Sequence, residues 1–188
     1  MNKELKNLIE NDIYRHFENN RPFMYKWRTP NLNYMIIFRK ANYHYTHNHK
    51  IRAFFYKFKM RKLSNKYHIQ IPIASHIGKG FYIGHFGRVI INGSAVIGNN
   101  CNIGTGVTIG YSARGKYKGV PTIGNKVWIG TNAVIVGNIN IGDDVLIAPN
   151  AYVNRDVPAH SVVFGNPMQI KPRENATEDY IIRVKEDD

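Results

Sequence analysis

A repeat of six residues dominates the hydrophobic pattern between Ile77 and Val153. A glycine follows eight of the repeated aliphatic residues, and a second small or apolar residue usually stands two positions before them. Two gaps of fourteen residues interrupt the repeat, and they predict small insertions at residues 84–96 and 110–122. The aliphatic positions, in order, are Ile77, Ile83, Ile97, Ile103, Ile109, Ile123, Ile129, Ile135, Ile141, Ile147 and Val153.

A unit of six residues is too short for a pair of helices, whereas it fits one short strand followed by a corner. Alternate residues of a strand point to the same side, so each repeated aliphatic residue and the residue two positions before it face inward. Glycine beside the aliphatic residue tolerates the backbone angles of the corner. Three units close a coil of about 18 residues, and stacked coils bury a ladder of aliphatic side chains. The pattern therefore predicts a mainly β fold, a parallel β-helix of about five coils over residues 70–170.

Residues 1–69 have a different, helical pattern. A helix over residues 1–20 is predicted by the spacing of Leu5, Leu8, Ile9, Ile13 and Phe17. Two prolines predict a loop over residues 21–31, and dense apolar residues between positions 34 and 62 predict two further helices that end near position 65. We expect this small helical region to cover the open end of the first coil, because the ends of solenoids need covering. A charged tail, residues 171–188, follows the repeat.

Three segments of the repeat resemble a known family: Ile77-Gly-Lys-Gly, Gly104-Thr-Gly-Val-Thr-Ile-Gly and the closing Gly165-Asn-Pro-Met. They are similar to the hexapeptide-repeat acyltransferases, and most similar to the serine acetyltransferase-like branch, which includes acetyltransferases of capsule and exopolysaccharide synthesis. The likeness covers roughly residues 70–172. It implies a left-handed parallel β-helix, against the usual right-handed preference of parallel crossovers. It also implies a homotrimer that binds acetyl-CoA between neighbouring subunits.

Acetyl transfer from a thioester to a hydroxyl needs a base whose pKa lies near neutrality and donors for the oxyanion. His85 follows Ile83 by two residues, at a predicted corner where side chains face outward. An outward-facing histidine is by itself more often an ordinary surface residue. In the resembling serine acetyltransferases, however, the matching place holds the catalytic histidine, within a short glycine-containing loop before an aliphatic run. The resemblance therefore implies that His85 is the general base.

The sequence departs from the serine acetyltransferase pattern at three positions. The acid that precedes the catalytic histidine in that family is Gly84 here, and its second active-site histidine falls on Val120. The acid that would orient the base falls on Gln70, which is equally well read as the first residue of a strand. Without the first two groups the site lacks charges that would hold a zwitterionic amino acid, because a desolvated charge without a partner is costly.

For the cofactor, the resemblance implies backbone contacts around Thr131 and Pro149, which occupy small-residue positions on adjacent coils. Lys171 and Arg173 follow the closing glycine–proline motif, and we expect them to meet the phosphates of acetyl-CoA. Any basic tail offers such residues, so this second expectation is the weaker inference. Cys101 occupies an inward position and is expected to be a small buried side chain. His44, His47 and His49 do not have the spacing of a zinc site, so we expect no metal.

We therefore expect an acetyl-CoA-dependent O-acetyltransferase that acts on a saccharide hydroxyl, of a polysaccharide or a lipid-linked precursor. Serine O-acetylation is the alternative enzyme activity, and a non-catalytic trimeric β-helix scaffold is the alternative of another class. The excursion at residues 110–122 is rich in glycine and lysine, which is typical of a protruding, mobile functional loop. The trimer is also predicted by apolar residues on the coil exterior, namely Tyr82, Ile90, Trp128, Val134 and Leu146.

The positive charge of the chain, a formal +13 over 188 residues, is concentrated near its start. Residues 1–70 hold 15 Lys and Arg against 4 Asp and Glu, and 14 aromatic residues accompany them. This composition predicts peripheral contact of residues 1–69 with an anionic membrane. We expect no nucleic acid, because no recognition-helix, zinc-finger or RNA-binding signature accompanies the charge. A single cysteine and the lack of a signal peptide or long apolar run predict a cytoplasmic protein, at the inner face of the membrane if that contact forms.

Overall fold

The computed structural model describes residues 2–17 and 29–185 and contains three helices before the repeat. The bounds are Lys3–Phe17 for α1, Pro30–Thr46 for α3 and Lys50–Tyr67 for α4. The three predicted helices are confirmed, although the second begins at its proline because proline suits the first helical position. The predicted loop lies mostly at residues 18–28, outside the described residues. No helix within the described ranges is both long and apolar enough to cross a bilayer.

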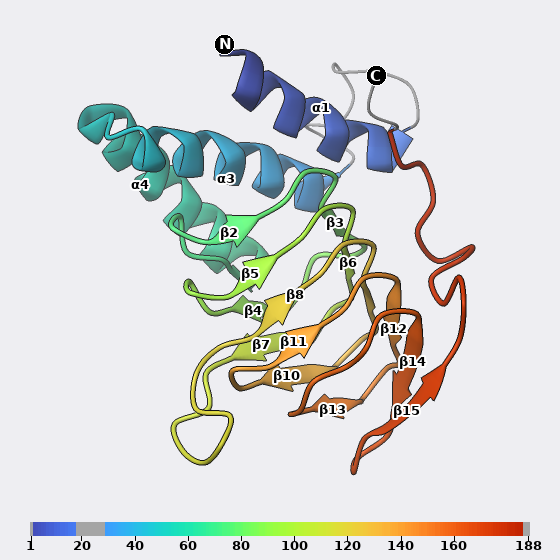
Figure 1. Ribbon diagram of the computed structural model, residues 1–188. Helices are drawn as coiled ribbons and strands as arrows, with labels where there is room; N and C mark the ends of the chain where they lie inside the picture. Colours follow the sequence, from blue (N-terminus) through green and yellow to red (C-terminus); the bar gives the residue numbers. More distant parts are fainter. Residues whose placement is uncertain (1, 18–28, 186–188) are drawn as a thin grey trace.

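The repeat forms a parallel β-helix of about five turns with three sheets, and the predicted fold class is confirmed (Figure 1). Its arrangement is consistent with the left-handed β-helix that the resemblance implies. The first sheet contains β1 (Ile69–Gln70), β4 (Val89–Ile91), β7 (Thr108–Gly110), β10 (Val134–Val136) and β13 (Tyr152–Val153). The second contains β2 (His76–Ile77), β5 (Val96–Ile97), β8 (Thr122–Ile123) and β11 (Asn140–Ile141). The third contains β3 (Tyr82–Ile83), β6 (Asn102–Ile103), β9 (Trp128–Ile129), β12 (Val145–Ile147), β14 (Ser161–Phe164) and the antiparallel β15 (Gln169–Pro172).

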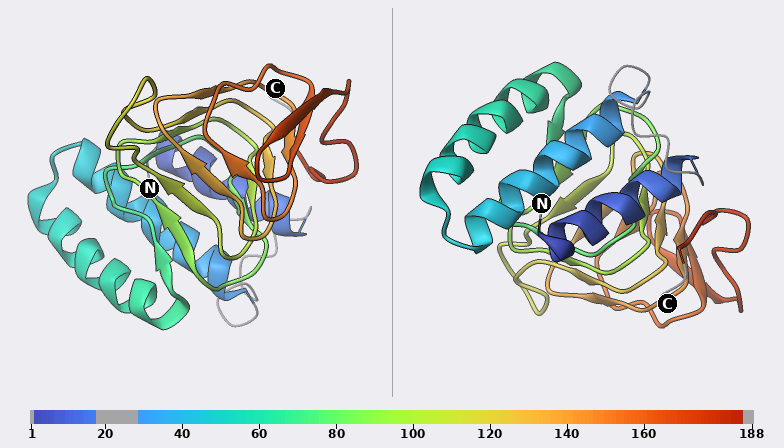
Figure 2. Two further views of the ribbon diagram at one scale, coloured as in Figure 1. Left: turned by 90° about the horizontal axis from the view of Figure 1, so that it is seen from below. Right: turned by 90° about the horizontal axis from the view of Figure 1, so that it is seen from above.

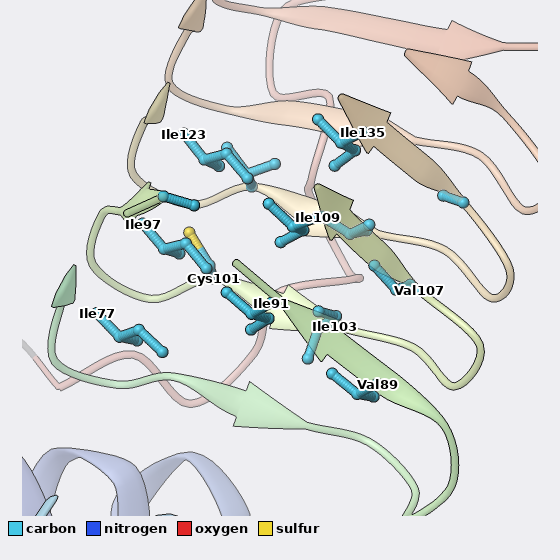
Figure 3. Packing of buried hydrophobic residues seen from close by; sticks show 14 of the residues in the cluster. Ile77, Val89, Ile91, Ile97, Cys101, Ile103, Val107, Ile109, Ile123 and Ile135 are labelled. Atoms are coloured by element: carbon cyan, nitrogen blue, oxygen red, sulfur yellow. The ribbon is translucent and has the colours of Figure 1, made fainter. Parts of the chain in front are cut away.

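The interior of the solenoid is the ladder of aliphatic side chains that the repeat predicts (Figure 3). Parallel pairing puts equivalent residues in register, so that Ile77 lies beside Ile97, and Ile97 beside Ile123. Cys101 is fully buried in the same ladder, and this burial raises the pKa of its thiol to about 12. The expectation that Cys101 is a buried structural side chain is therefore confirmed.

The two gaps in the repeat are not alike, and here the structure corrects the sequence interpretation. Along the second sheet, successive turns from Ile77 to Ile97, to Ile123 and to Ile141 contain 20, 26 and 18 residues. The first gap therefore adds only two residues to a turn, because Ile91 fills an unrecognised aliphatic position within it. The second gap adds eight residues and forms the excursion at 110–122, which leaves the solenoid at the lower left of Figure 1.

Polar side chains stack along the corner between the second and third sheets. The side-chain oxygen of Asn99 accepts a hydrogen bond from the backbone N–H of Lys79, at 3.0 Å. The amide oxygen of Asn125 accepts from the N–H of Asn99, and the carboxylate of Asp143 accepts from the N–H of Asn125. Each turn thus supplies the acceptor for a corner N–H of the turn before it, which satisfies groups that sheet pairing leaves open.

The helices cover the first turn, and a buried ion pair fastens them there (Figure 2). The guanidinium of Arg39 in α3 donates to both carboxylate oxygens of Asp12 in α1, at 2.8 and 3.0 Å. The same guanidinium donates to the carbonyl oxygens of Ile77 and Gly78, and the Asp12 carboxylate accepts from the N–H of Phe81. The expected cap is therefore held by a network that joins two helices to the first coil.

Candidate active site

His85 lies in the two-residue insertion, at the corner where the chain passes from the third sheet to the first. The backbone around it is fastened to the end of α4, because the N–H of Gly87 donates to the carbonyl of Tyr67 and that of Val89 to the carbonyl of His68. Gly87 has a φ of +143°, which favours glycine at this position. The His85 side chain is exposed, as the corner position predicts.

The corner that carries His85 is continued on later turns by Thr131 and Pro149. Glycines on the preceding turn, opposite Thr131 and Pro149, allow the backbones to stack closely. A Cβ at Gly104 would lie 2.8 Å from the backbone nitrogen of Thr131, and one at Gly130 would lie 2.6 Å from the nitrogen of Pro149. Two of the residues named for the cofactor therefore lie on the same edge of the solenoid as His85.

A cavity of about 360 Å³ opens at this edge and contains both His85 and Thr131 in its wall. It is formed by the outer side of the third sheet, by the end of α1 and by the C-terminal tail. The remaining lining residues are Arg15, Tyr82, Gly84, Asn102, Ile103, Gly104, Trp128, Tyr180, Ile182 and Arg183. The structure thus brings one predicted base and one predicted cofactor residue into a single pocket.

Arg15, from α1, is a functional candidate that the sequence interpretation missed. The residue is buried, with a relative exposure of 3%. It donates one hydrogen bond from Nη2 to the side-chain oxygen of Asn102, while its Nε and Nη1 have no partner among the described residues. Burial lowers the pKa of Arg15 to about 10, so the guanidinium stays protonated at neutral pH. The pocket therefore contains a cation whose hydrogen-bonding capacity is only partly used.

The other predicted site residues lie elsewhere. Lys171 is exposed in β15, and the N–H of Arg173 donates to the carbonyl of His160 at the far end of the solenoid. Gln70 is exposed in β1, and within the described part of the chain no hydrogen bond joins it to His85. Val120 lies in the excursion between the first and second sheets, at the opposite edge of the first sheet from His85. Within one chain, these residues are not assembled around the base.

The coil exterior differs from the predicted apolar surface. Tyr82 contacts His16 of α1 with a ring-centroid distance of 4.5 Å, and Trp128 contacts Tyr180 of the tail at 4.8 Å. Leu146 is buried as well. The sequence analysis expected Tyr82, Ile90, Trp128, Val134 and Leu146 all to be exposed to solvent in a monomer. This expectation is wrong, because α1 and the tail pack against the outer side of the third sheet. The outer apolar residues Ile90 and Val134 of the first sheet remain partly exposed.

The C-terminal tail, which forms one wall of the cavity that contains His85, is held in place by Asp144. This carboxylate accepts hydrogen bonds from the backbone N–H groups of Ala176 and Thr177, from the Thr177 hydroxyl and from His160. Burial acts to raise the pKa of Asp144, but these hydrogen bonds outweigh it and lower the pKa. The hydrogen bond to Asp144 and the nearby Glu174 raise the pKa of His160. The contribution of His160 to the stability of the fold is therefore complete below the pKa that it has in the unfolded chain, and it is lost as the pH rises through its raised pKa. The contribution of Asp144 to stability is lost as the pH falls through its lowered pKa.

Replacing Asp144 by alanine is expected to release the tail from the solenoid. The change leaves two backbone donors and the Thr177 hydroxyl without their acceptor, which is unfavourable where these groups are shielded from water. Limited trypsin digestion should then cut after Arg173 or Arg183 at least about tenfold faster than in the unchanged protein. Asp156→Ala is the matched control, since Asp156 accepts a hydrogen bond from the N–H of Asn140 and none from the tail residues that the structure describes. Equal digestion of both variants would show that the anchor lies elsewhere.

Comparison with known proteins agrees with this architecture. The model of the bacterial transferase hexapeptide family (six repeats) matches residues 121–155. Serine acetyltransferase 2 of Arabidopsis thaliana is 38% identical over 109 residues, which are 58% of this chain and 34% of that protein. The chain thus spans about a third of the length of this relative.

Solved structures extend the likeness to the helices. A crystal structure of Neisseria gonorrhoeae serine acetyltransferase in complex with serine has a TM-score of 0.74 and 28% identity, over 89% of this chain and 69% of that one. Serine acetyltransferase from Brucella abortus strain S19 in complex with coenzyme A has a TM-score of 0.78 over 92% and 70% of the two chains; at 24% identity, this likeness concerns the fold. The resemblance predicted from the repeat is confirmed: the chain contains hexapeptide repeats and is similar to serine acetyltransferases in sequence and in fold.

Proposed function

We propose that the protein is an acetyl-CoA-dependent O-acetyltransferase in which His85 is the general base. The observation that carries this proposal is the shared cavity of His85 and Thr131 at the stacked corner. His85 would take the proton from the acceptor hydroxyl while its oxygen attacks the thioester carbonyl. The carbon–sulfur bond then breaks, the acetyl ester forms, and the sulfur of coenzyme A leaves and receives the proton. No covalent intermediate on the protein is required.

The acetyl donor would be acetyl-CoA, since the relatives are serine acetyltransferases and one of the similar structures is a complex with coenzyme A. Thr131 and Pro149 would present backbone groups to the pantetheine arm along the corner. Lys171 and Arg173 would meet the phosphates at the end of the solenoid, where both side chains are exposed. Thr131 and Pro149 lie at the corner between the third and first sheets, whereas Lys171 and Arg173 lie on β15 and just after it, towards His160 at the other end of the third sheet, so an elongated ligand would have to extend between the two places.

The first acceptor that we propose is L-serine. Its support is the set of relatives, which are serine acetyltransferases, and the neighbour in complex with serine. Arg15 bears on this acceptor, because a protonated guanidinium in the wall of the same cavity would favour a bound carboxylate. The departures at Gly84 and Val120 mean that these contacts would differ from those implied by the resemblance.

A saccharide hydroxyl is the second acceptor, and the charge of the pocket favours it. Among the described lining residues there are two arginines, Arg15 and Arg183, and no carboxylate. A bound amino acid would leave its ammonium group without an acidic partner there, which is costly in a desolvated site. A sugar hydroxyl needs only space, hydrogen bonds and a base. Gly84 contributes space, because a Cβ there would have no neighbour closer than 3.6 Å.

The proposed assembly is a homotrimer that brings the excursion of one subunit to the His85 corner of the next. Its support is the first sheet, whose two edges carry these two features, and the apolar residues Ile90, Val134 and Tyr152 on its outer side. Sedimentation equilibrium at micromolar concentration should give three times the chain mass of 21.6 kDa. A monomer under these conditions would remove the inter-subunit cofactor site from the proposal.

Release of coenzyme A, corrected for hydrolysis, tests the activity and the acceptor together. The purified chain is given acetyl-CoA with L-serine, or with a panel of neutral and acidic sugars, and the acetylated product is identified by mass spectrometry. Efficient formation of O-acetylserine supports the first acceptor, and acetylated sugar with negligible O-acetylserine supports the second. An unchanged melting temperature with acetyl-CoA and no product with any acceptor would favour the scaffold alternative, since a ligand that binds the folded form must stabilise it.

A further inference from the structure

Helix α4 exposes a row of large apolar side chains to solvent. Ile51, Phe54, Phe55 and Phe58 have relative exposures of 87%, 76%, 54% and 56%. Their spacing of three and four residues puts them on one side of the helix. We call these four residues the apolar stripe. A stripe of this kind is unusual on a soluble surface, because a helix normally buries its apolar side.

The rest of α4 is strongly basic. The helix contains Lys50, Arg52, Lys57, Lys59, Arg61, Lys62 and Lys66, and it contains no Asp or Glu. Two of the lysines lie against the stripe: the Lys59 ammonium is 4.5 Å from the ring centroid of Phe55, and that of Lys62 is 4.9 Å from the centroid of Phe58. Apolar rings with cations at their margin are the arrangement of helices that lie in a lipid headgroup layer.

The position of α4 leaves the stripe accessible. The helix packs on α3 with its opposite side, where Ala53 and Met60 are its buried residues. In both views of Figure 2 it lies at the outer edge of the molecule, beside α3 and away from the last coils. The fold therefore holds α4 in place without using the stripe.

We propose that the apolar stripe and the surrounding lysines and arginines of α4 form a docking surface for an anionic lipid bilayer. Pairing of two α4 helices from two copies of the chain would bury the rings, but it would also bring together two helices of seven positive charges each. A bilayer with anionic headgroups covers the same rings and neutralises the same charges. Charge complementarity thus selects this occupant.

Docking through α4 would also hold the candidate active site near the bilayer. The N–H of Gly87 donates to the carbonyl of Tyr67 at the end of α4, and the Tyr67 and Phe86 rings are 6.1 Å apart. Phe86, next to His85, is itself exposed. An acceptor carried on a lipid would meet the His85 corner from this side, although lipid binding does not depend on the proposed activity.

Co-sedimentation of the full chain with vesicles tests the docking surface. We expect binding to phosphatidylcholine vesicles that contain about one third phosphatidylglycerol, and at least about tenfold weaker binding to phosphatidylcholine alone. The binding to anionic vesicles should weaken as salt rises, because exposed charges are screened over about 8–10 Å at physiological ionic strength. Equal binding to both vesicles, or binding to neither, overturns the proposal.

Two double variants test whether α4 is responsible for the binding to vesicles. Phe54→Ser with Phe55→Ser, and separately Lys57→Glu with Lys62→Glu, should each lower partitioning by at least about tenfold, since both rings and charges contribute. The controls are Tyr111→Ser, an exposed aromatic residue elsewhere, and Lys116→Glu with Lys118→Glu in the excursion, which makes the same charge change. Circular dichroism checks that every variant is folded. Controls that lose binding as much as the α4 variants would overturn the assignment.

Competing partners give different results in the same preparations. Saturable binding to duplex DNA or RNA that exceeds binding to anionic vesicles would point to a nucleic-acid surface and overturn the lipid proposal. Loss of the oligomer in the Phe54 and Phe55 variant, without a change in vesicle binding, would identify the stripe as a contact between copies. Acetyl transfer to a soluble acceptor is measured separately without vesicles, so failure of either proposal leaves the other intact.

Discussion

Replacing His85 by alanine is expected to lower acetyl transfer by about 10²–10⁴-fold, the usual contribution of a general base. The side chain lies in the wall of the cavity shared with Thr131, at a corner that the end of α4 holds in place. Because His85 is exposed, the substitution should leave the fold and the binding of acetyl-CoA intact. The turnover number should therefore fall while the thermal shift with acetyl-CoA persists.

His76→Ala is the matched control for this experiment. His76 is an exposed histidine in β2 of the second sheet, and it does not line the cavity. Its replacement should leave turnover within about twofold of the unchanged protein, since a substitution at an exposed position away from the candidate active site has little effect on the folded protein. A His85→Ala variant with full activity would exclude His85 as the base, whichever acceptor proves correct.

Replacing Asp12 by alanine is expected to lower the free energy of unfolding by about 3–5 kcal/mol, because it breaks a buried ion pair and leaves the partner charge in the interior. Asp12 and Arg39 have side-chain exposures of 0% and 1%. Without the carboxylate, Arg39 would keep only carbonyl partners, and the N–H of Phe81 would lose its acceptor. The loss should appear as a lower midpoint of urea unfolding with an unchanged slope.

The same helix supplies a control for the ion pair. Lys6 and Glu10 in α1 form a pair at 3.7 Å in which Lys6 is exposed and Glu10 partly exposed, and Glu10→Ala should cost no more than about 0.5 kcal/mol. The double variant Asp12→Ala with Arg39→Met should be less destabilised than the sum of the single changes, because the unpaired charge is removed. An Asp12→Ala cost as small as that of Glu10→Ala would show that the cap is held by apolar packing instead.

Periodicity in the sequence was enough to predict the solenoid and the identity of most of its inward residues. The reason is that a six-residue repeat is a local pattern. The position of each strand, corner and inward-facing side chain is determined by residues only a few positions away in the sequence. Cys101 is a direct example, since its place two residues before Ile103 predicts burial without knowledge of any distant contact. His85 was found in the same way, from its place at a corner and its resemblance to a family motif.

The two gaps in the repeat have equal lengths, but the insertions that they contain do not. A gap of fourteen residues divides into two strand steps at residues 84–96 but spans only one at 110–122. The first gap contains a residue that fits the repeat, Ile91, which lies six residues before Ile97 and two after Val89, but no glycine follows it and its position was not recognised. Strand pairing with Ile109 on the next turn decides its role.

The sequence by itself determined the β-helix, the helical start of the chain, the corner position of His85 and the basic, aromatic composition of α4. Only the tertiary structure decided that Arg15 and His85 line one cavity, that Asp12 and Arg39 fasten the cap, and that α1 covers Tyr82 and the tail covers Trp128. Arg15 meets Asn102 across 87 residues, and Arg183 donates to the carbonyl of His16 across 167. Contacts of such separation arise from the packing of whole elements, and no local pattern of hydrophobic and polar residues encodes which partners will meet.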